Sequence, residues 1–210
     1  MPPNPKETPA LHDRALQDLS FIRRTMEGAA SFTDVPGWGL VGVGSTALVA
    51  APIAAQQSTP VRWISVWMIT AVVAVGFGSA AMLRKMRRRV TTGEALQFTT
   101  PTRKFLFGFW PAILVGAVLT AALTDPFTPG IEAHVTSRLL PGLWLLLYGL
   151  GVMTAGAYSI RAVPLMGMVF MALGTITLLV PFAIGDVMMA LGFGLLQLAF
   201  GIHIARRHGG

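Results

Sequence analysis

Gln197 is the most polar residue near the middle of any long apolar run in this 210-residue chain. Its amide can donate and accept hydrogen bonds, but it cannot serve as an acid, a base or a nucleophile. The candidate partners are threonines in other runs: Thr70, Thr154, Thr175 and Thr177. We favour a hydrogen bond between helices, because polar side chains in membrane spans chiefly hold helices together. Contact with a ligand is the alternative interpretation.

The central turns of the apolar runs contain no Asp, Glu, Lys or Arg. Transporters usually need such residues inside the membrane for proton relays and substrate sites. The sequence therefore disfavours a proton-coupled carrier or a pump. An enzyme acting on lipid would need acids or histidines near the interface. The acids placed there are scattered over both sides: Asp34, Glu94, Asp125 and Asp186. We therefore predict no catalytic centre.

The four histidines and the lack of cysteine give no metal-binding pattern. Haem between helices would need histidines at matched depth, and zinc would need several ligands on one face. Only His203 is near a span, at its inner end beside Arg206 and Arg207. The other histidines are His12, His134 and His208. No glycine cluster between a strand and a helix forms a phosphate loop. We predict neither a metal nor a cofactor.

Seven of the sixteen Lys and Arg residues lie in the segment 84–104, which connects two apolar runs. Such a block stays on the cytoplasmic side, because moving it across the bilayer is costly. There it can contact anionic headgroups, at about 1 kcal/mol for each Lys or Arg near the surface. The lipid or partner contacts predicted here are Arg84, Lys85, Arg87, Arg88 and Arg89. No aromatic residues alternate with them for base stacking, so we expect no nucleic-acid partner.

The composition indicates an integral membrane protein. Of its residues, 53% are apolar and 12% are charged, whereas soluble domains carry roughly 25% charged residues. Six apolar runs approach the ~20 residues that a helix needs to cross the hydrocarbon core. We place these spans at 36–55, 62–83, 105–123, 141–160, 164–182 and 186–204. Pro36, Pro141 and Pro164 suit helix starts, where a missing N–H costs least. Asp186 suits an N-cap. The predicted fold class is an all-α, six-helix transmembrane bundle.

Fourteen of the sixteen Lys and Arg residues fall on one side of these spans, and only Arg62 and Arg138 fall on the other. The positive-inside rule therefore places both termini in the cytoplasm. The chain divides into a cytoplasmic segment 1–35, the transmembrane domain 36–204 and a cytoplasmic tail 205–210. Aromatic residues are expected at both membrane interfaces. They are Trp38, Trp110 and Tyr158 at inner ends and Trp63, Trp67, Trp144 and Phe182 at outer ends.

Residues 9–27 carry the pattern of an amphipathic helix. Apolar residues recur every three or four positions: Leu11, Ala15, Leu19, Ile22 and Met26. A helix with one apolar stripe is expected to lie in the cytoplasmic interface. Arg23, Arg24 and Glu27 occupy its other faces, where they can reach anionic headgroups or a protein partner. A plain interfacial anchor is the alternative.

The connections and the glycines complete the predicted bundle. Short surface helices are expected over 92–98 and 131–135. Glycine pairs separated by one residue recur in the spans, at 76 and 78, 149 and 151, and 192 and 194. Small residues let helices approach closely in lipid. We expect these pairs to pack within one bundle, and an interface between copies of a homo-oligomer is the alternative.

The stretch ALQDLSFIRRTME at 15–27, followed by SFT at 31–33 and VPGWG at 35–39, carries a resemblance. It resembles the opening of an uncharacterised group of bacterial multi-pass inner-membrane proteins with six helices. The resemblance covers about 25 residues. It implies a bacterial inner-membrane location, and it implies no particular activity, cofactor or partner.

The sequence therefore predicts a non-enzymatic accessory or sensory component of the membrane, whose cytoplasmic face contacts a protein or lipid. A small transporter or channel for a neutral or apolar solute is the alternative. A water-filled cavity across the midplane would favour the transporter. A solid bundle packed through glycine and alanine would favour the accessory component.

Overall fold

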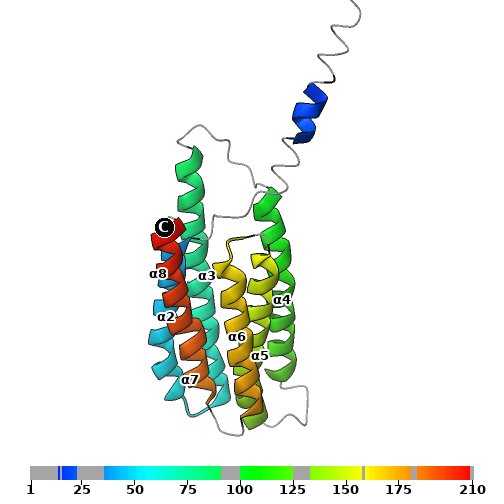
Figure 1. Ribbon diagram of the computed structural model, residues 1–210. Coiled ribbons are helices and arrows are strands. Elements are labelled where there is room, and N and C mark those ends of the chain that lie inside the picture. Colours follow the sequence, from blue (N-terminus) through cyan, green and yellow to red (C-terminus); the bar gives the residue numbers. More distant parts are fainter. Residues whose placement is uncertain are drawn as a thin grey trace, which may run out of the picture.

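The computed structural model of the protein describes residues 14, 16–22, 36–90, 100–124, 133–157, 159–180 and 184–208. The helices that it contains are α2 Gly37–Ala55, α3 Pro60–Val90, α4 Thr100–Thr124, α5 Ala133–Gly156 and α6 Ala162–Leu179. A last rod has three parts, which are α7 Gly185–Met189, the π-helix η1 Ala190–Leu196 and α8 Gln197–His208. Figure 1 shows these helices side by side in one bundle.

Six helices of the described chain are long and apolar enough to cross a membrane. They are Gly37–Ala55, Pro60–Arg84, Arg103–Thr124, Arg138–Gly156, Ala162–Leu179 and Gly185–Arg207. Each apolar run is a helix because a helix satisfies its own backbone hydrogen bonds in hydrocarbon. The predicted all-α, six-helix transmembrane fold is confirmed. Arg14 and residues 16–22 are also helical. The remainder of 9–27 lies outside the described residues, so the interfacial amphipathic helix stays a prediction.

The spanning helices alternate in direction and pack in two groups (Figure 1). In one group, α2 packs against both α3 and the rod formed by η1 and α8. In the other group, α5 packs against both α4 and α6. We call the surface where α5 and α6 meet the first group the junction. Because α5 faces α4, α6 and the junction, half of its apolar span is buried.

Glycines set the short distance between α5 and α6. Gly142, Gly149 and Gly156 recur every seven residues on α5, so they lie on one face of the helix. A Cβ on Gly149 would lie 2.7 Å from the carbonyl oxygen of Gly167 on α6. A Cβ on Gly167 would lie 2.6 Å from the backbone nitrogen of Met153. A larger residue at either glycine would therefore force the two helices apart.

The α2–α8 pair is built in the same way. A Cβ on Gly44 would lie 2.8 Å from the carbonyl oxygen of Gly194, and one on Gly201 would lie 2.8 Å from the backbone nitrogen of Val41. Gly37, the first residue of α2, lies against the backbone of Ala205 near the end of α8. The first span therefore begins at the same end of the bundle at which the last span ends.

The predicted packing of the glycine pairs is confirmed on two helices and wrong on a third. Gly151 on α5 faces Ala112 of α4, and Gly192 in η1 faces Leu145 of α5. In contrast, nothing lies within 4 Å of a Cβ built on Gly76 or Gly78 of α3. Those two glycines point away from the described helices, because only one face of α3 contacts the bundle.

The sequence indicated that Pro141 starts a span, and the structure shows that it does not. It lies inside α5, which begins at Ala133 and takes in residues 133–135 of the predicted surface helix. Spanning helices tolerate such prolines where neighbouring elements compensate. Pro141 is buried, and a Cβ on Gly185 would lie 2.8 Å from its ring. It therefore packs against the start of α7. The other predicted surface helix, 92–98, lies outside the described residues.

Two further boundaries differ from the prediction. The N-cap of α7 is Ile184, without a side-chain hydrogen bond, and Asp186 lies in the first turn. Asp186 is not the N-cap because its carboxylate bonds to a tryptophan instead. At the end of span two, α3 continues to Val90. The basic block is therefore the last part of a helix rather than a loop, since Lys, Arg and Met favour helix and cations suit its C-terminus.

Candidate functional site

The polar side chains inside the bundle meet at the junction. At one end of it, the indole Nε1 of Trp63 on α3 donates a 2.7 Å hydrogen bond to Oδ1 of Asp186 on α7. The same indole stacks on that of Trp144 on α5, with ring centroids 5.6 Å apart and planes 4° from parallel. Trp144 in turn donates to the hydroxyl of Thr120 on α4 at 2.8 Å. Four helices are linked through these contacts.

Trp63 and Trp67 were expected at the outer end of their span, and their side chains face the bundle rather than its surface. Both indoles are turned into the bundle, with 7% and 4% of their surface exposed. They pack edge to face, with centroids 6.4 Å apart. The Trp67 Nε1 has no hydrogen-bond partner. Trp38 and Trp110, expected at the other interface, are 63% and 65% exposed.

Gln197 lies near the middle of the last span and reaches across the junction to α5. Its Nε2 donates a 2.8 Å hydrogen bond to the hydroxyl oxygen of Tyr148. The Tyr148 ring packs against three phenylalanines, with centroids 4.8–5.7 Å away, on three other helices. They are Phe109, Phe170 and Phe193. The polar pair is therefore enclosed by aromatic rings, and Gln197 is only 1% exposed.

One end of the Gln197 amide remains unpaired. Its Oε1 is buried without a hydrogen-bond partner. Exchanging the amide oxygen and nitrogen would not help, because one of the two atoms would still face away from Tyr148. The unpaired atom is fully buried, which leaves no water-sized space beside it. An unsatisfied buried polar atom costs about 1–3 kcal/mol, so this arrangement carries a penalty.

The backbone next to Gln197 is also unusual. The seven residues Ala190–Leu196 form a π-helix, and the Gln197 N–H bonds to the carbonyl oxygens of Gly192 and Gly194. Such segments are rare, and they occur often at functional sites. The π-helix and the unpaired amide atom therefore lie together, at the part of the last span that faces the junction.

The threonines proposed as partners of Gln197 bond elsewhere. Thr70, Thr175 and Thr177 each donate to the carbonyl four residues earlier in their own helix. Thr154 also makes such a bond, and in addition donates to the carbonyl oxygen of Gly108 on α4 at 2.8 Å. A threonine hydroxyl lies close to the backbone of its own helix, so it bonds there in preference to a side chain on a more distant helix.

Tyr148 is the functional candidate that sequence reasoning missed. A phenol in the interior of a spanning helix needs a hydrogen-bond partner, and this was the available signal. Tyr148 lies well inside the apolar run, and its neighbours in the sequence are typical of any apolar helix. The partner on another helix could not be identified, because the helix pairing was unknown.

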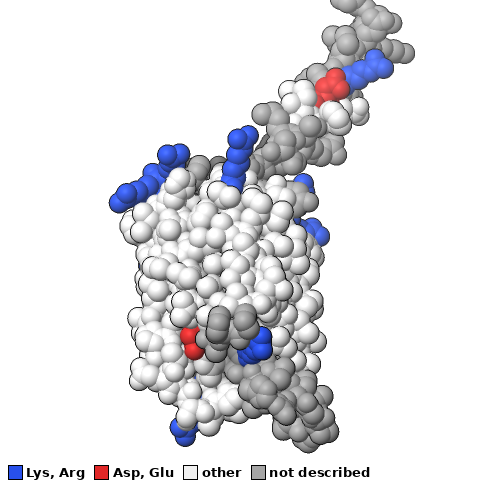
Figure 2. Space-filling view, turned by 60° about the horizontal axis from the view of Figure 1, so that its bottom comes forward, with Lys and Arg blue, Asp and Glu red and all other residues white. Residues whose placement is uncertain are grey.

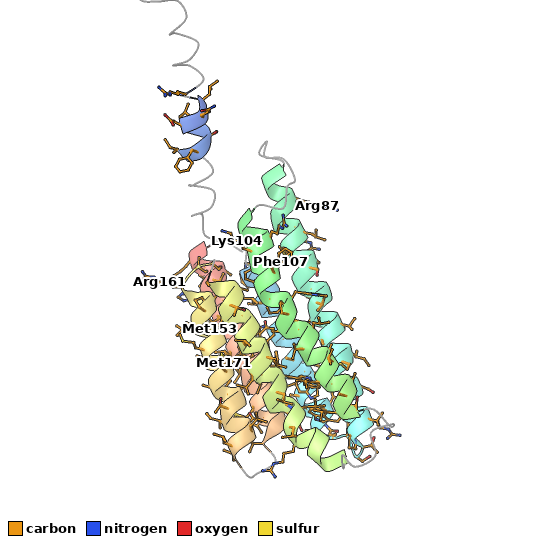
Figure 3. The ribbon with its side chains drawn as sticks, turned by 90° about the vertical axis from the view of Figure 1, so that its right-hand side faces the viewer. Arg87, Lys104, Phe107, Met153, Arg161 and Met171 are labelled. Atoms are coloured by element: carbon orange, nitrogen blue, oxygen red, sulfur yellow. The ribbon has the colours of Figure 1, made fainter. Side chains whose placement is uncertain are left out.

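The second candidate region is the end of the bundle at which α3 ends and α4 begins. The described cations there are Arg84, Arg87, Arg103, Lys104, Arg161, Arg206 and Arg207. Figure 2 shows Lys and Arg side chains at the two ends and a broad uncharged surface between. Figure 3 shows Arg87 on α3, Lys104 on α4 and Arg161 in the α5–α6 connection close to the same end. We call this end the basic end.

The predicted contact residues are only partly described. Arg84 and Arg87 are exposed on α3, at the basic end. Lys85, Arg88 and Arg89 belong to the same helix, and their side chains are outside the description. Arg23, Arg24 and Glu27 lie outside the described residues altogether. At the start of α4, the Arg103 guanidinium lies 5.6 Å from the centre of the Phe107 ring, in a cation–π contact.

Within the described ranges, no group of three or more His, Cys, Asp or Glu side chains could hold a metal ion. The expected lack of a metal and of a cofactor stays a prediction. Comparisons of the chain with protein-family models, curated proteins and solved structures gave no match.

Proposed function

We propose that the protein is a non-enzymatic accessory or sensory component of the bacterial inner membrane, with both termini in the cytoplasm. It acts through the basic end, which contacts anionic lipid headgroups and a protein partner. The bundle serves to hold this end at the membrane surface. The N-terminal segment, with Arg23, Arg24 and Glu27, adds to the same contact surface.

The distribution of charge is the observation that carries this proposal. Seven described cations from α3, α4, α8 and the α5–α6 connection meet at the basic end. The described cations of the opposite end are Arg62 and Arg138. Such a bias is typical of a cytoplasmic surface. It also favours a partner with negative charge, since each exposed Lys or Arg near anionic headgroups contributes about 1 kcal/mol.

The length of α3 supports a contact role for the basic end. The helix has 31 residues, and at about 1.5 Å per residue it is roughly 46 Å long. The hydrocarbon core is only about 30 Å thick. The end of α3 with its basic block therefore extends past the core as a helix. A helical extension presents its arginines in fixed directions, which suits the recognition of a surface.

The packing within each group supports a structural rather than a transporting bundle. Backbone contacts at Gly149, Gly167 and Gly44 leave little space between the paired helices. The polar groups found at the junction are mostly amide, hydroxyl and indole. None of these serves readily as an acid or a base near neutral pH.

The test is site-specific photocrosslinking in intact cells. A photoreactive amino acid replaces Arg87 at the basic end or, as the matched control, Arg62 at the opposite end; both side chains are exposed. The proposal predicts one or a few discrete protein adducts, or a lipid adduct enriched in anionic species, from position 87 alone. Equal adduct patterns from the two positions would contradict it.

The unpaired Oε1 of Gln197 motivates a second candidate, a transporter or channel for a small neutral solute. The observed form has no water-sized space beside this atom, so a solute would reach it only after the two helix groups move apart. Proteoliposome flux of water, glycerol and urea distinguishes the candidates. Protein-dependent flux that the Gln197→Leu variant abolishes would establish the transporter and displace the accessory component.

A further inference from the structure

The last span contains a π-helical segment between two α-helical parts. A π-helical turn is an α-helix that accommodates one additional residue, and its hydrogen bonds are less favourable. When such a turn reverts to α-helix, the parts on its two sides must rotate relative to one another by about 100° and shift by about 1.5 Å, the step of one residue. In this protein the turn is η1, which joins α7 to α8.

The two sides of η1 are held by different neighbours. On one side, α8 is interlocked with α2, because Gly201 meets the backbone of Val41 and Gly37 meets that of Ala205. On the other side, α7 has only five residues, and Gly185 at its start packs against the Pro141 ring of α5. Among the described residues, the side-chain hydrogen bond that joins α7 to another helix is the one from Trp63 to Asp186. The short α7 is therefore the part that can turn, while α8 stays in place.

The surroundings of η1 favour conversion. Gly192 and Gly194 lie within it, and glycine tolerates a change of backbone conformation better than other residues. Directly after it, Gln197 has an unpaired and fully buried amide oxygen. The observed form therefore leaves a hydrogen-bonding demand unmet directly beside the segment that would convert.

From these observations we infer that η1 is a two-state element, in which conversion to α-helix turns α7 relative to α8. In this inference the Trp63–Asp186 hydrogen bond stabilises the observed, π-helical form. Met189 is 2% exposed in the observed form. Turning α7 by about 100° takes Asp186 away from Trp63 and moves Met189 out of the core. The inference concerns a movement within the bundle, so it holds or fails separately from the proposed contact role of the basic end.

The test uses the methionine methyl groups as reporters. The full-length protein, with 13C-methyl methionine, is placed in lipid nanodiscs, and relaxation dispersion is recorded for Met189 on α7. Met166 on α6 is the matched control, since it is equally buried at 2% exposure. Movements of helix register fall in the microsecond-to-millisecond range that this method detects. We expect exchange at Met189 and none at Met166.

Two variants test whether the exchange arises from η1 and from the Trp63–Asp186 hydrogen bond. Trp63→Phe removes the indole N–H, and we expect the population of the minor state to rise at least threefold. Deletion of Leu195, an exposed residue of η1, removes the additional residue and should abolish the exchange while α7 and α8 keep their contacts. If that deletion prevents folding, the Trp63→Phe result decides. The inference is overturned if Met189 shows no exchange in both the natural protein and Trp63→Phe, or if exchange persists after the deletion.

Discussion

Trp63 and Asp186 are 123 residues apart in the sequence, and a 2.7 Å hydrogen bond joins them at the junction. Since the Trp63 indole also stacks on Trp144, one side chain connects α3, α5 and α7. The hydrogen bond lies within the first helix group, and the stack with Trp144 extends the contact to the second group. At this end of the junction the Trp63 indole therefore contacts both groups.

The first prediction concerns this bond. Hydrogen bonds to charged groups contribute about 1.5–3 kcal/mol. Trp63→Phe should therefore lower the free energy of unfolding by at least that amount, because it also removes part of the stacking on Trp144. Asp186→Asn keeps an acceptor oxygen and should cost less. Unfolding in detergent, monitored for both single variants and the double variant, provides the measurement. Strictly additive losses would show that the two residues do not interact.

The second prediction compares two glycines in different surroundings. Gly167→Ala places a methyl group against the backbone of Met153 and Gly149, and overpacking of this kind costs about 1–3 kcal/mol. Gly78→Ala meets nothing within 4 Å and should be neutral or should stabilise α3 by up to about 1 kcal/mol. Thermal unfolding of the two variants in one detergent tests the difference. Equal shifts would mean that the α5–α6 pair is not closely packed.

The third prediction concerns a hydrogen bond between α4 and α5. Thr154→Val removes the bond to the carbonyl oxygen of Gly108, and such bonds in membranes contribute about 0.6 kcal/mol on average and at most about 1.7. Thr175→Val is the control, because its hydroxyl bonds only within its own helix. Thr154→Val should lower the unfolding free energy by more than Thr175→Val. A larger loss in the control would contradict the assignment.

The positions of the six spans could be predicted from hydropathy, because the length of an apolar run and the backbone demand in lipid leave little choice. The ends could not be predicted as well. Pro141 suggested a helix start, but the residues before it are already helical, and the Pro141 ring packs against Gly185. The basic block was expected in a loop, yet Arg84 and the residues after it remain helical to Val90.

The junction was beyond sequence reasoning for a different reason. Gln197 was identified from its polarity, but its partner depends on which helices are neighbours, and hydropathy does not specify this. Trp63 and Trp67 resembled interfacial residues because they lie near a span end, and the side that faces the bundle is not evident from the sequence. The π-helix leaves no hydrophobic signature, since every residue from Ala190 to Leu196 is apolar or glycine.

The fourth prediction concerns the N-terminal segment. Removing residues 1–30 deletes Arg23, Arg24 and Glu27, and it leaves all six spans intact. If these residues contribute to the contact surface, the truncated protein should insert normally and lose at least part of the partner set that co-purifies with the full chain. Normal insertion with an unchanged partner set would make the segment a plain membrane anchor.

The central claim is that the basic end faces the cytoplasm, and the chain offers a direct test because it contains no cysteine. Single variants Arg87→Cys and Arg62→Cys place one thiol at an exposed position on each end of the bundle. Intact cells are treated with a membrane-impermeant maleimide, before and after permeabilisation of the inner membrane. Labelling of Arg62→Cys in intact cells, with Arg87→Cys labelled only after permeabilisation, is the predicted result. Labelling of Arg87→Cys in intact cells would contradict the account.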